Sequence, residues 1–337
     1  MGARPGRGKQ ETGRQNNAVG GSTIALGEKR HTWLGACKCR LCDAADNRIG
    51  PVMVSLNSFY PARFRKDVTV IPVVRLHGTI MAGGNQFRQN LNIATVAPLL
   101  AKAFADKKAP AVAIMVNSPG GSPVQSRLIY KRIRDLAAEK NKKVLIFVED
   151  VAASGGYMIA CAGDEIIADP SSVVGSIGVI SAGFGFTGLI DKIGVERRVY
   201  TAGENKSVLD PFQPENPEDV SRLKDLQLDI HQVFIDLVKD SRGTRLKQDA
   251  DLFTGRFWTG IRGKEMGLVD ELGDLRSTLR ARYGDKVKMR LVTGQRNLFG
   301  RRVAGASASI AADTLAGIGE AGLNALEDRA LWARYGL

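Results

Sequence analysis

The chain has 337 residues, and its 44% hydrophobic content is enough to bury a core in one large domain or two small ones. Its formal net charge of +13 lies mostly at the ends, with +5 over residues 1–52, +6 over residues 276–337 and only +2 between them. A near-neutral middle with basic flanks argues against a nucleic-acid groove built into the fold, so we expect no nucleic-acid partner.

The apolar runs of the chain are short. None reaches the ~18–20 residues that a membrane-spanning helix requires. The basic, glycine-rich start also lacks the apolar segment of a secretory signal peptide. The sequence therefore predicts no transmembrane anchor and a cytoplasmic protein, with peripheral association at the membrane left open.

The first 52 residues show no sustained hydrophobic period, which predicts an irregular, disordered leader that fold and chemistry do not need. Within this leader, Cys37, Cys39 and Cys42 follow His31 in the run "CKCRLC". Their spacing is tight and no second ligand pair follows, so we expect neither a zinc site nor any other metal.

From Val68 the pattern becomes regular, and short β-branched runs alternate with amphipathic helices. This alternation predicts βαβ units and a mainly parallel sheet in an α/β domain over residues 53–290. Cys161 falls in an apolar helical pattern, which favours a reduced thiol in the core. The expected strands are 68–76, 111–116, 144–149 and 165–168, with two further pieces around 177–180 and 195–200, and the expected helices are about 91–106, 123–140 and 155–162.

A longer helix is expected from Asn216 to near Gly243, because apolar residues recur there at helical spacing. Asn216 is an N-cap followed by proline, and Ser122 begins its own helix in the same way. The apolar face of the long helix predicts a core contact or an oligomer seam. Residues 291–337 predict a flexible to helical tail, since 300–322 are rich in Gly, Ala and Ser.

Ser154 stands between a buried strand and an apolar helix in "VEDVAASGGYMIA". Its hydroxyl would lie at the positive end of that helix, where backbone N–H groups face outward and an oxyanion is favoured. A plain N-cap serine would give the same local pattern. A second glycine-rich turn, "MVNSPGGSP" at residues 115–123, follows another buried strand, so two strand ends with exposed N–H groups could flank one acyl carbon.

A nucleophilic serine needs a base, and the chain has only three histidines. His31 lies in the leader, His77 ends the first strand and His231 sits inside the long helix, so a Ser-His-Asp triad is poorly supported. A lysine can replace histidine when burial lowers the pKa of its amine. Lys206, in the turn "YTAGENKSVLDPF", is a candidate because it follows the expected piece at 195–200.

Four ordered blocks of the sequence carry a family resemblance: "VNSPGG", "AASGGYMIACAGDEIIADPSSVVGSIGV", "YTAGENKSVLDPF" and "TGRFWTGIRGKEMGLVDELG". In order and spacing they closely resemble the signal peptide peptidase A (protease IV) family of serine proteases, in a short single-copy form without a transmembrane segment. The likeness covers about residues 68–275. It implies a ClpP/crotonase-like spiral of βαβ units with a mainly parallel sheet.

The resemblance also implies a role for each matching residue. Ser154 would be the nucleophile and Lys206 the general base, with Ser176 hydrogen-bonded to the lysine amine. Gly121 would supply an oxyanion-hole N–H, with Gly155 as a second donor. Chemistry of this kind requires no metal and no cofactor.

Short single-copy members of the family assemble as rings that bring the lysine and the serine of neighbouring subunits together. The resemblance therefore implies a homo-oligomer, an octamer-like ring. The function it implies is a serine endopeptidase with a Ser/Lys dyad that cleaves peptides, such as signal-peptide remnants or unfolded chains, through an acyl-enzyme. Two alternatives stay open. A crotonase-type acyl-CoA enzyme would need carboxylates in its cleft, and an inactive scaffold would be favoured by a solvated Lys206.

Overall fold

A computed structural model of the chain describes residues 68–83, 90–203, 205–294, 325–326 and 328–337. The chain divides into two units, Met1–Phe64 and Arg65–Leu337, and all the described residues belong to the second. The predicted leader, with His31 and its three cysteines, and the segment 300–322 lie outside the described residues.

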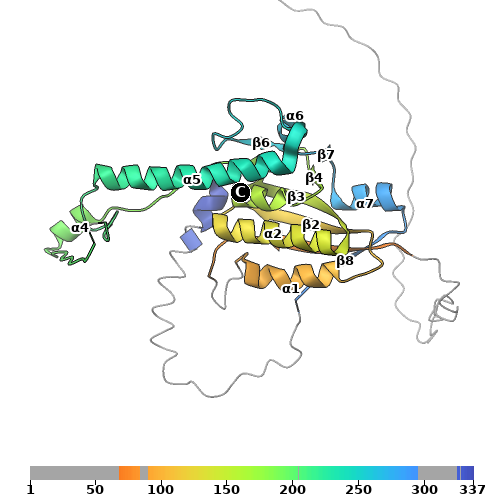
Figure 1. The fold of residues 1–337 in the computed structure, drawn as a ribbon, viewed down its shortest axis with the longest axis horizontal. Helices are drawn as coiled ribbons and strands as arrows, with labels where there is room; N and C mark the ends of the chain where they lie inside the picture. The colour runs from red at the N-terminus through yellow and green to blue at the C-terminus, as the bar shows by residue number, and fades with distance from the viewer. Residues whose placement is uncertain (1–67, 84–89, 204, 295–324, 327) are drawn as a thin grey trace, which may run out of the picture. The chain divides into compact units, whose positions relative to one another are not determined.

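Strands and helices alternate along most of the described chain, as the sequence pattern predicts (Figure 1). In chain order they are β1 (Val70–His77), α1 (Ile93–Phe104), β2 (Ala111–Ser118), α2 (Pro123–Lys140), β3 (Lys143–Ala153), α3 (Gly155–Ala160), β4 (Glu165–Ala168), β5 (Val173–Gly175), α4 (Thr187–Lys192), α5 (Pro217–Arg242), a 3-10 turn (Gly243–Arg245), β6 (Phe257–Thr259), α6 (Gly260–Glu265), β7 (Glu271–Leu272), α7 (Leu275–Tyr283) and β8 (Lys288–Leu291).

Eight strands of the described chain form one sheet in the order β6-β5-β3-β2-β1-β8, with β4 beside β3 and β7 beside β4. All pairs are parallel except β5 with β6. Helix α1 connects β1 to β2, and helix α2 connects β2 to β3. A helical crossover of this kind is the usual connection between two parallel neighbouring strands. The predicted α/β fold with βαβ units and a mainly parallel sheet is confirmed.

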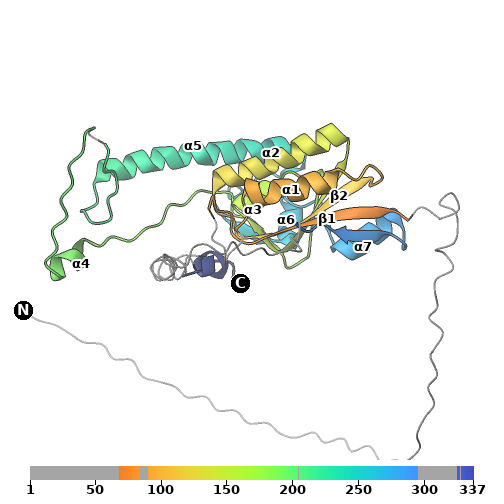
Figure 2. The same ribbon diagram turned by 90° about the horizontal axis from the view of Figure 1, so that it is seen from below.

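The central strands are buried on both faces, and successive residues point to opposite sides of the sheet. Val112 and Ile114 join the larger core cluster, which includes residues of α1, α2, α3 and α5. Ala111 and Ala113 belong to the smaller cluster on the other face, where Leu279 of α7 packs. Figure 2 shows α1, α2 and α5 on one side of the sheet and α7 on the other.

Two of the predicted strand pieces are wrong. Residues 177–180 and 195–200 form no strand, and the sheet instead gains β5 just before the first of them. The second piece belongs to an exposed arm, residues 179–203 and 205–216, that includes α4. Helix α4 buries none of its residues, so the β-branched residues of this arm have no neighbouring strand to pair with in the single chain.

The predicted helix starts are confirmed. The Ser122 side chain accepts a hydrogen bond from the Gln125 N–H at the start of α2, and Asn216 accepts one from Glu218 at the start of α5. Cys161 is a buried free thiol, and burial raises its pKa to about 12, so it fits the predicted reduced core cysteine. No helix in the described part of the chain has both the length and the apolar character to span a bilayer.

A buried ion pair fastens the end of α5 to the sheet. The Arg242 guanidinium donates two hydrogen bonds of 2.8 Å to the Asp270 carboxylate and a third, of 2.9 Å, to the Gly267 carbonyl. Asp270 also accepts a 2.7 Å bond from the Ile166 N–H. Burial raises the pKa of the Asp270 carboxyl, but the hydrogen bonds from Arg242 and Ile166 outweigh it and hold this pKa below its ordinary value.

Replacing Arg242 with alanine should lower the free energy of unfolding by about 3 kcal/mol, because the partly buried Asp270 carboxylate loses both bonds from Arg242. Among the described residues, it keeps only the 3.1 Å contact with Arg245 and the bond from the Ile166 N–H. Denaturant unfolding of Arg242→Ala checks this. Arg222→Ala is the matched control, since Arg222 pairs with Glu218 and Asp219 on the surface and should cost no more than about 0.5 kcal/mol.

The same ion pair predicts a pH dependence of stability. The Asp270 pKa is lower in the folded chain than in the unfolded one, so the pair stabilises the fold fully above the ordinary aspartate pKa of about 3.9. This contribution is lost as the pH falls through the lowered folded value. The variant Arg242→Ala should therefore lose less stability in acid than the native chain, and equal acid sensitivity would contradict the prediction.

Candidate active site

Ser154 lies at the sharp turn between β3 and α3, with φ +52° and ψ −124°. A positive φ is strained for a residue with a side chain and costs about 1–3 kcal/mol. Its backbone is fixed on both sides, because the Ser154 N–H donates to the Gly175 carbonyl at 2.8 Å and its own carbonyl accepts from the Met158 N–H at 3.0 Å. The Ser154 side chain makes no capping hydrogen bond. The structure thus does not support a plain N-cap role for this hydroxyl.

Ser176 follows β5 as Ser154 follows β3. These two strands are parallel neighbours, and Ala153 is paired with Gly175, so the two serines leave the sheet side by side. Ser176 also has a positive φ, +53°, and its N–H donates to the Arg256 carbonyl at 2.7 Å. Both serines line the same cavity.

The glycine turn after β2 lies directly against Ser154. Gly120 has φ +106°, and a Cβ added there would lie 2.8 Å from the Ser154 Cβ and 2.9 Å from the Gly155 nitrogen. At Gly121, with φ +136°, a Cβ would lie 2.1 Å from the Ile80 carbonyl oxygen. Ile80 holds this turn through two backbone bonds, accepting from the Ser122 N–H at 2.7 Å and donating to the Gly120 carbonyl at 2.9 Å. Only glycine fits at both positions.

Two backbone donors of this region have no acceptor. No hydrogen bond within the described residues uses the N–H of Gly121 or of Gly155, and both glycines line the cavity that contains Ser154. Gly155 is the first residue of α3, where helix geometry leaves the N–H without an intrahelical partner. Two such donors beside a serine are the arrangement that stabilises the oxyanion of an acyl-transfer reaction.

The substitution Gly120→Ala should displace Ser154 and lower the free energy of unfolding by about 1–3 kcal/mol, since its Cβ clashes with the serine while its φ stays strained. Thermal unfolding measures the stability, and peptide hydrolysis measures the displacement. Gly284→Ala is the matched control, because Gly284 has φ +87° but open space around it. It should share the strain and leave hydrolysis unchanged; equal hydrolysis by both variants would contradict the assigned contact.

The cavity around Ser154 has a volume of ≈ 810 Å³, within the range of ligand-binding pockets. Part of the lining comes from the glycine turn, Ser154 and the segment that begins at Ser176. Another part is mainly apolar and comes from one face of α5. The α5 residues that line the cavity are Leu223, Leu226, Gln227, Ile230, His231 and Phe234. The sequence predicted a core or oligomer contact for this helix face, and the structure places part of it at the cavity.

Neither histidine of the described chain is hydrogen-bonded to Ser154. The Nε2–H of His231 donates to the Ile177 carbonyl at 3.0 Å, which ties the segment after Ser176 to α5. His77 ends β1, and its ring lies 5.6 Å from that of Trp332. His231 itself lines the Ser154 cavity, and the expectation that the site uses no Ser-His-Asp triad stays a prediction.

Lys206 lies in the exposed arm and is not among the residues that line the Ser154 cavity. Figures 1 and 2 show α4, in the same arm, away from the sheet. The single chain therefore brings Ser154, Ser176, Gly121 and Gly155 together and leaves Lys206 outside their cavity. The predicted roles of all five residues stay predictions.

Sequence reasoning missed the end of the chain. Leu331 and Arg334 line the Ser154 cavity, and the Tyr335 hydroxyl lies 3.2 Å from the Ser176 hydroxyl and donates to it. The available signal was the helical spacing of Leu331, Trp332 and Tyr335, which lie in the segment that the sequence predicts as a flexible to helical tail.

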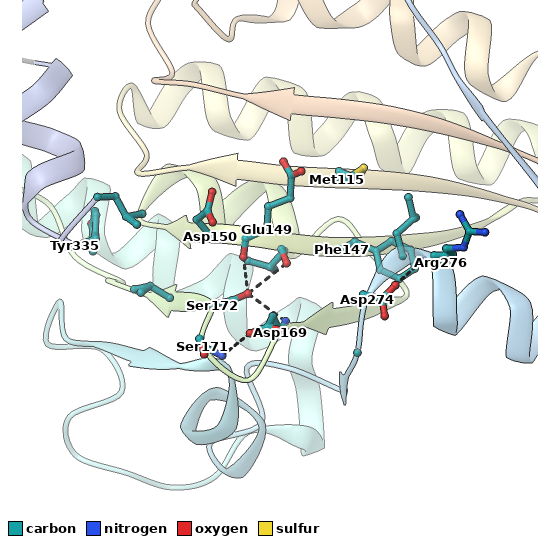
Figure 3. Close-up of a pocket in the computed structure, with 15 residues that line it drawn as sticks. Met115, Phe147, Glu149, Asp150, Asp169, Ser171, Ser172, Asp274, Arg276 and Tyr335 are labelled. Atoms are coloured by element: carbon teal, nitrogen blue, oxygen red, sulfur yellow. Dashed lines mark hydrogen bonds between the residues drawn. The ribbon is translucent and has the colours of Figure 1, made fainter. Parts of the chain in front are cut away.

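A second cavity, of ≈ 620 Å³, lies beside β3 and the start of α7 (Figure 3). Several of its acidic groups already have partners in the fold: Asp169 accepts from the Ser171 N–H at 2.8 Å, and Asp274 caps α7. It contains neither Ser154 nor Ser176 among its lining residues. In the described part of the chain, no cluster of His, Cys, Asp or Glu is arranged to hold a metal. We therefore place the candidate chemistry in the first cavity.

Comparison with known proteins gives the family. Residues 137–288 match the model of peptidase family S49. The chain is 34% identical over 212 residues to "Putative protease slr0021" of Synechocystis, covering 61% of this chain and 76% of that protein. It is 34% identical over 213 residues to "Protease 4" of Haemophilus influenzae, covering 60% of this chain and 32% of that protein. The chain belongs to peptidase family S49, and the predicted family resemblance is confirmed.

A higher identity links the chain to much longer proteins. It is 62% identical over 286 residues to a protein of Brucella abortus named "Na(+)/H(+) antiporter NhaA", covering 84% of this chain and 39% of that protein. A protein of Brucella melitensis with the same name matches equally well. The chain thus spans less than half the length of these relatives.

Proposed function

We propose that this chain is a serine endopeptidase with Ser154 as its nucleophile. The strongest support is that three features meet at one cavity. Ser154 has a strained backbone, its hydroxyl does not cap α3, and the N–H groups of Gly121 and Gly155 beside it have no acceptor among the described residues. Strain of this kind persists where the surrounding structure fixes it, and it gathers at catalytic positions. Membership of a peptidase family gives the reaction class.

In the proposed reaction the Ser154 oxygen attacks the carbonyl carbon of a peptide bond while a neutral lysine amine accepts the hydroxyl proton. The N–H groups of Gly121 and Gly155 stabilise the oxyanion that forms. The lysine then gives its proton to the leaving amine, and water hydrolyses the acyl-enzyme to restore the serine. No metal or cofactor takes part in these steps.

The proposed base is Lys206 of a neighbouring copy of the chain. Within one chain Lys206 lies outside the Ser154 cavity, so a dyad requires either movement of the arm or a second copy. The arm exposes large apolar side chains, among them Phe184, Ile193 and Tyr200, the last with 91% of its surface exposed. Apolar surface gathered in this way favours contact with another protein. We infer a homo-oligomer, with the octamer-like ring as the form that the family resemblance implies.

The proposed substrates are peptides and unfolded chains, including signal-peptide remnants. The α5 wall of the cavity, with Ile230 and Phe234, offers apolar surface for substrate side chains, while the glycine turn offers backbone donors. We propose a cytoplasmic protein that can work at the membrane surface. The named antiporter relatives of Brucella support that location, because an antiporter is a membrane protein.

Two other functions are less well supported. An acyl-CoA enzyme of the crotonase type would need carboxylates in the cleft, and no Asp or Glu is among the described residues that line the Ser154 cavity. An inactive scaffold is favoured by one observation, the exposure of Lys206 in the single chain. The oligomeric assembly decides between scaffold and enzyme, because a ring can bury the Lys206 side chain that a single chain exposes.

Hydrolysis assays separate these functions. The purified full-length chain should cleave fluorogenic peptides with apolar residues and an unfolded casein substrate, and chelators should not slow it. It should not turn over acyl-CoA thioesters. Thioester hydrolysis without peptide cleavage would support the crotonase-type reaction, and a folded oligomer inert toward every substrate would support the scaffold.

A further inference from the structure

The C-terminal segment 328–337 contributes to the walls of both cavities, and its Tyr335 and Leu337 line the second one. Residues 328–333 are helical, and a turn follows at 334–336. Leu331 and Arg334 contribute to the lining of the Ser154 cavity. The Tyr335 hydroxyl donates its 3.2 Å bond to Ser176, the residue to which the family resemblance assigns the orientation of the lysine. The segment 328–337 therefore occupies a hydrogen-bonding position that the proposed mechanism needs.

Several side chains hold this segment in place. The Trp332 ring lies 5.6 Å from the ring of His77 at the end of β1, and Tyr335 packs edge-on against Phe257 of β6 at 5.1 Å. The Thr79 hydroxyl donates to the Asp328 carboxylate. Aromatic pairs in such geometries are stabilising beyond the area that they bury. Together with the bond to Ser176, the segment therefore contacts three parts of the fold: the end of β1, β6 and the turn after β5.

The segment has a helical conformation, which differs from that of a bound peptide substrate. A peptide that binds beside a strand end is extended, and its free N–H and C=O groups pair with the protein. Residues 328–333 are helical, so the segment presents no extended peptide bond to Ser154.

We propose that residues 328–337 form an autoinhibitory segment that narrows the Ser154 cavity and engages the Ser176 hydroxyl. The segment must leave before a substrate and the lysine can enter together. The role of Ser176 in this proposal rests on the proposed peptidase function, whereas the position of the segment at the cavity wall does not.

The test compares the rate at which a fluorophosphonate labels Ser154 in full-length variants. Trp332→Ala combined with Tyr335→Ala should label about tenfold faster than the native chain, because the labelling rate follows the fraction of open molecules. Tyr335→Phe keeps the ring on Phe257, removes only the bond to Ser176, and should give a smaller increase. Leu326→Ala is the control within the same region, since Leu326 is 67% exposed, and it should label like the native chain.

A synthetic peptide of residues 325–337 provides a second measurement. It should slow the labelling of the double variant, whereas the same peptide with both aromatic residues replaced by alanine should not. A dye-labelled copy should bind the double variant that also carries Ser154→Ala, measured by fluorescence anisotropy, with circular dichroism as the folding control. Binding there requires no catalysis.

The outcomes separate the two proposals. Equal labelling rates for the native chain and the double variant, together with no peptide binding, would overturn the autoinhibitory segment and leave the peptidase standing. Peptide binding without labelling of Ser154 in any variant would overturn the peptidase and support the docked segment. Faster labelling that the added peptide reverses supports both.

Discussion

Peptide hydrolysis should fall by about 10⁴-fold or more when Ser154 is replaced by alanine, because no other group can form the acyl-enzyme. The variant should fold normally. Its backbone at φ +52° is fixed by bonds to Gly175 and from Met158 that do not involve the side chain. Rates with a fluorogenic peptide and thermal unfolding of Ser154→Ala and the native chain check both statements.

Ser172→Ala is the matched control for this loss. Ser172 is also a buried serine beside β3, but its hydroxyl donates to the Glu149 carbonyl, accepts from the Asp169 N–H at 3.1 Å and lies outside the Ser154 cavity. Its loss should lower stability by about 1 kcal/mol and leave the rate per folded molecule unchanged. Hydrolysis that survives in Ser154→Ala but fails in Ser172→Ala would reverse the assignment of the two cavities.

Replacing Lys206 with arginine should abolish hydrolysis almost as completely as loss of Ser154, by about 10³-fold or more, because arginine keeps the charge but cannot accept the serine proton. Since Lys206 lies in the exposed arm, the variant should fold and assemble normally. Ser176→Ala should be impaired less, because it removes one hydrogen bond to the base. Steady-state hydrolysis of the three variants, with size-exclusion chromatography as the assembly control, gives this order.

Mixing of variants tests whether the base comes from a neighbouring copy. Ser154→Ala and Lys206→Arg chains are unfolded together and refolded as mixed oligomers. If each site joins two copies, about a quarter of the sites in an equal mixture carry both native residues, and activity returns to that extent. No recovery in oligomers shown to be mixed would place the dyad within one chain and require the arm to move. Near-native activity of Lys206→Arg alone would exclude Lys206 as the base.

The βαβ part of the fold could be predicted because local patterns determine it. The runs that form β1, β2 and β3 are mainly apolar, as expected for strands that are buried over most of both faces, and Ser122 and Asn216 mark helix starts by their own capping bonds. β5 could not be predicted, because three residues carry too little pattern and the strand exists only through its pairing with β3 and β6. The sequence pattern predicts a strand at residues 195–200 of the arm, but this segment has no neighbouring strand to pair with in the described part of the chain. A local pattern cannot show that a pairing partner is missing.

The candidate site also has a part that local sequence patterns predict and a part that depends on contacts between distant segments. Ser154 and the glycines beside it stand in short motifs, and a positive φ or a tight contact leaves a signature in the residue type at that position. The cavity walls contributed by α5 and by Leu331 and Arg334 depend on packing between distant segments, which no local spacing reveals. Lys206 was found only through the family motif, and the described chain leaves its contact with Ser154 to be proposed.

The most direct test of the central claim is to locate the adduct of a fluorophosphonate on the full-length protein. Trypsin releases Ser154 and Ser176 on one peptide, residues 144–192, so fragmentation of that peptide must assign the modified serine. We predict a single adduct on Ser154 that is absent from Ser154→Ala and absent from the unfolded native chain. An adduct on Ser176 or on a serine outside the cavity, or labelling that persists unchanged in Ser154→Ala, would contradict the account.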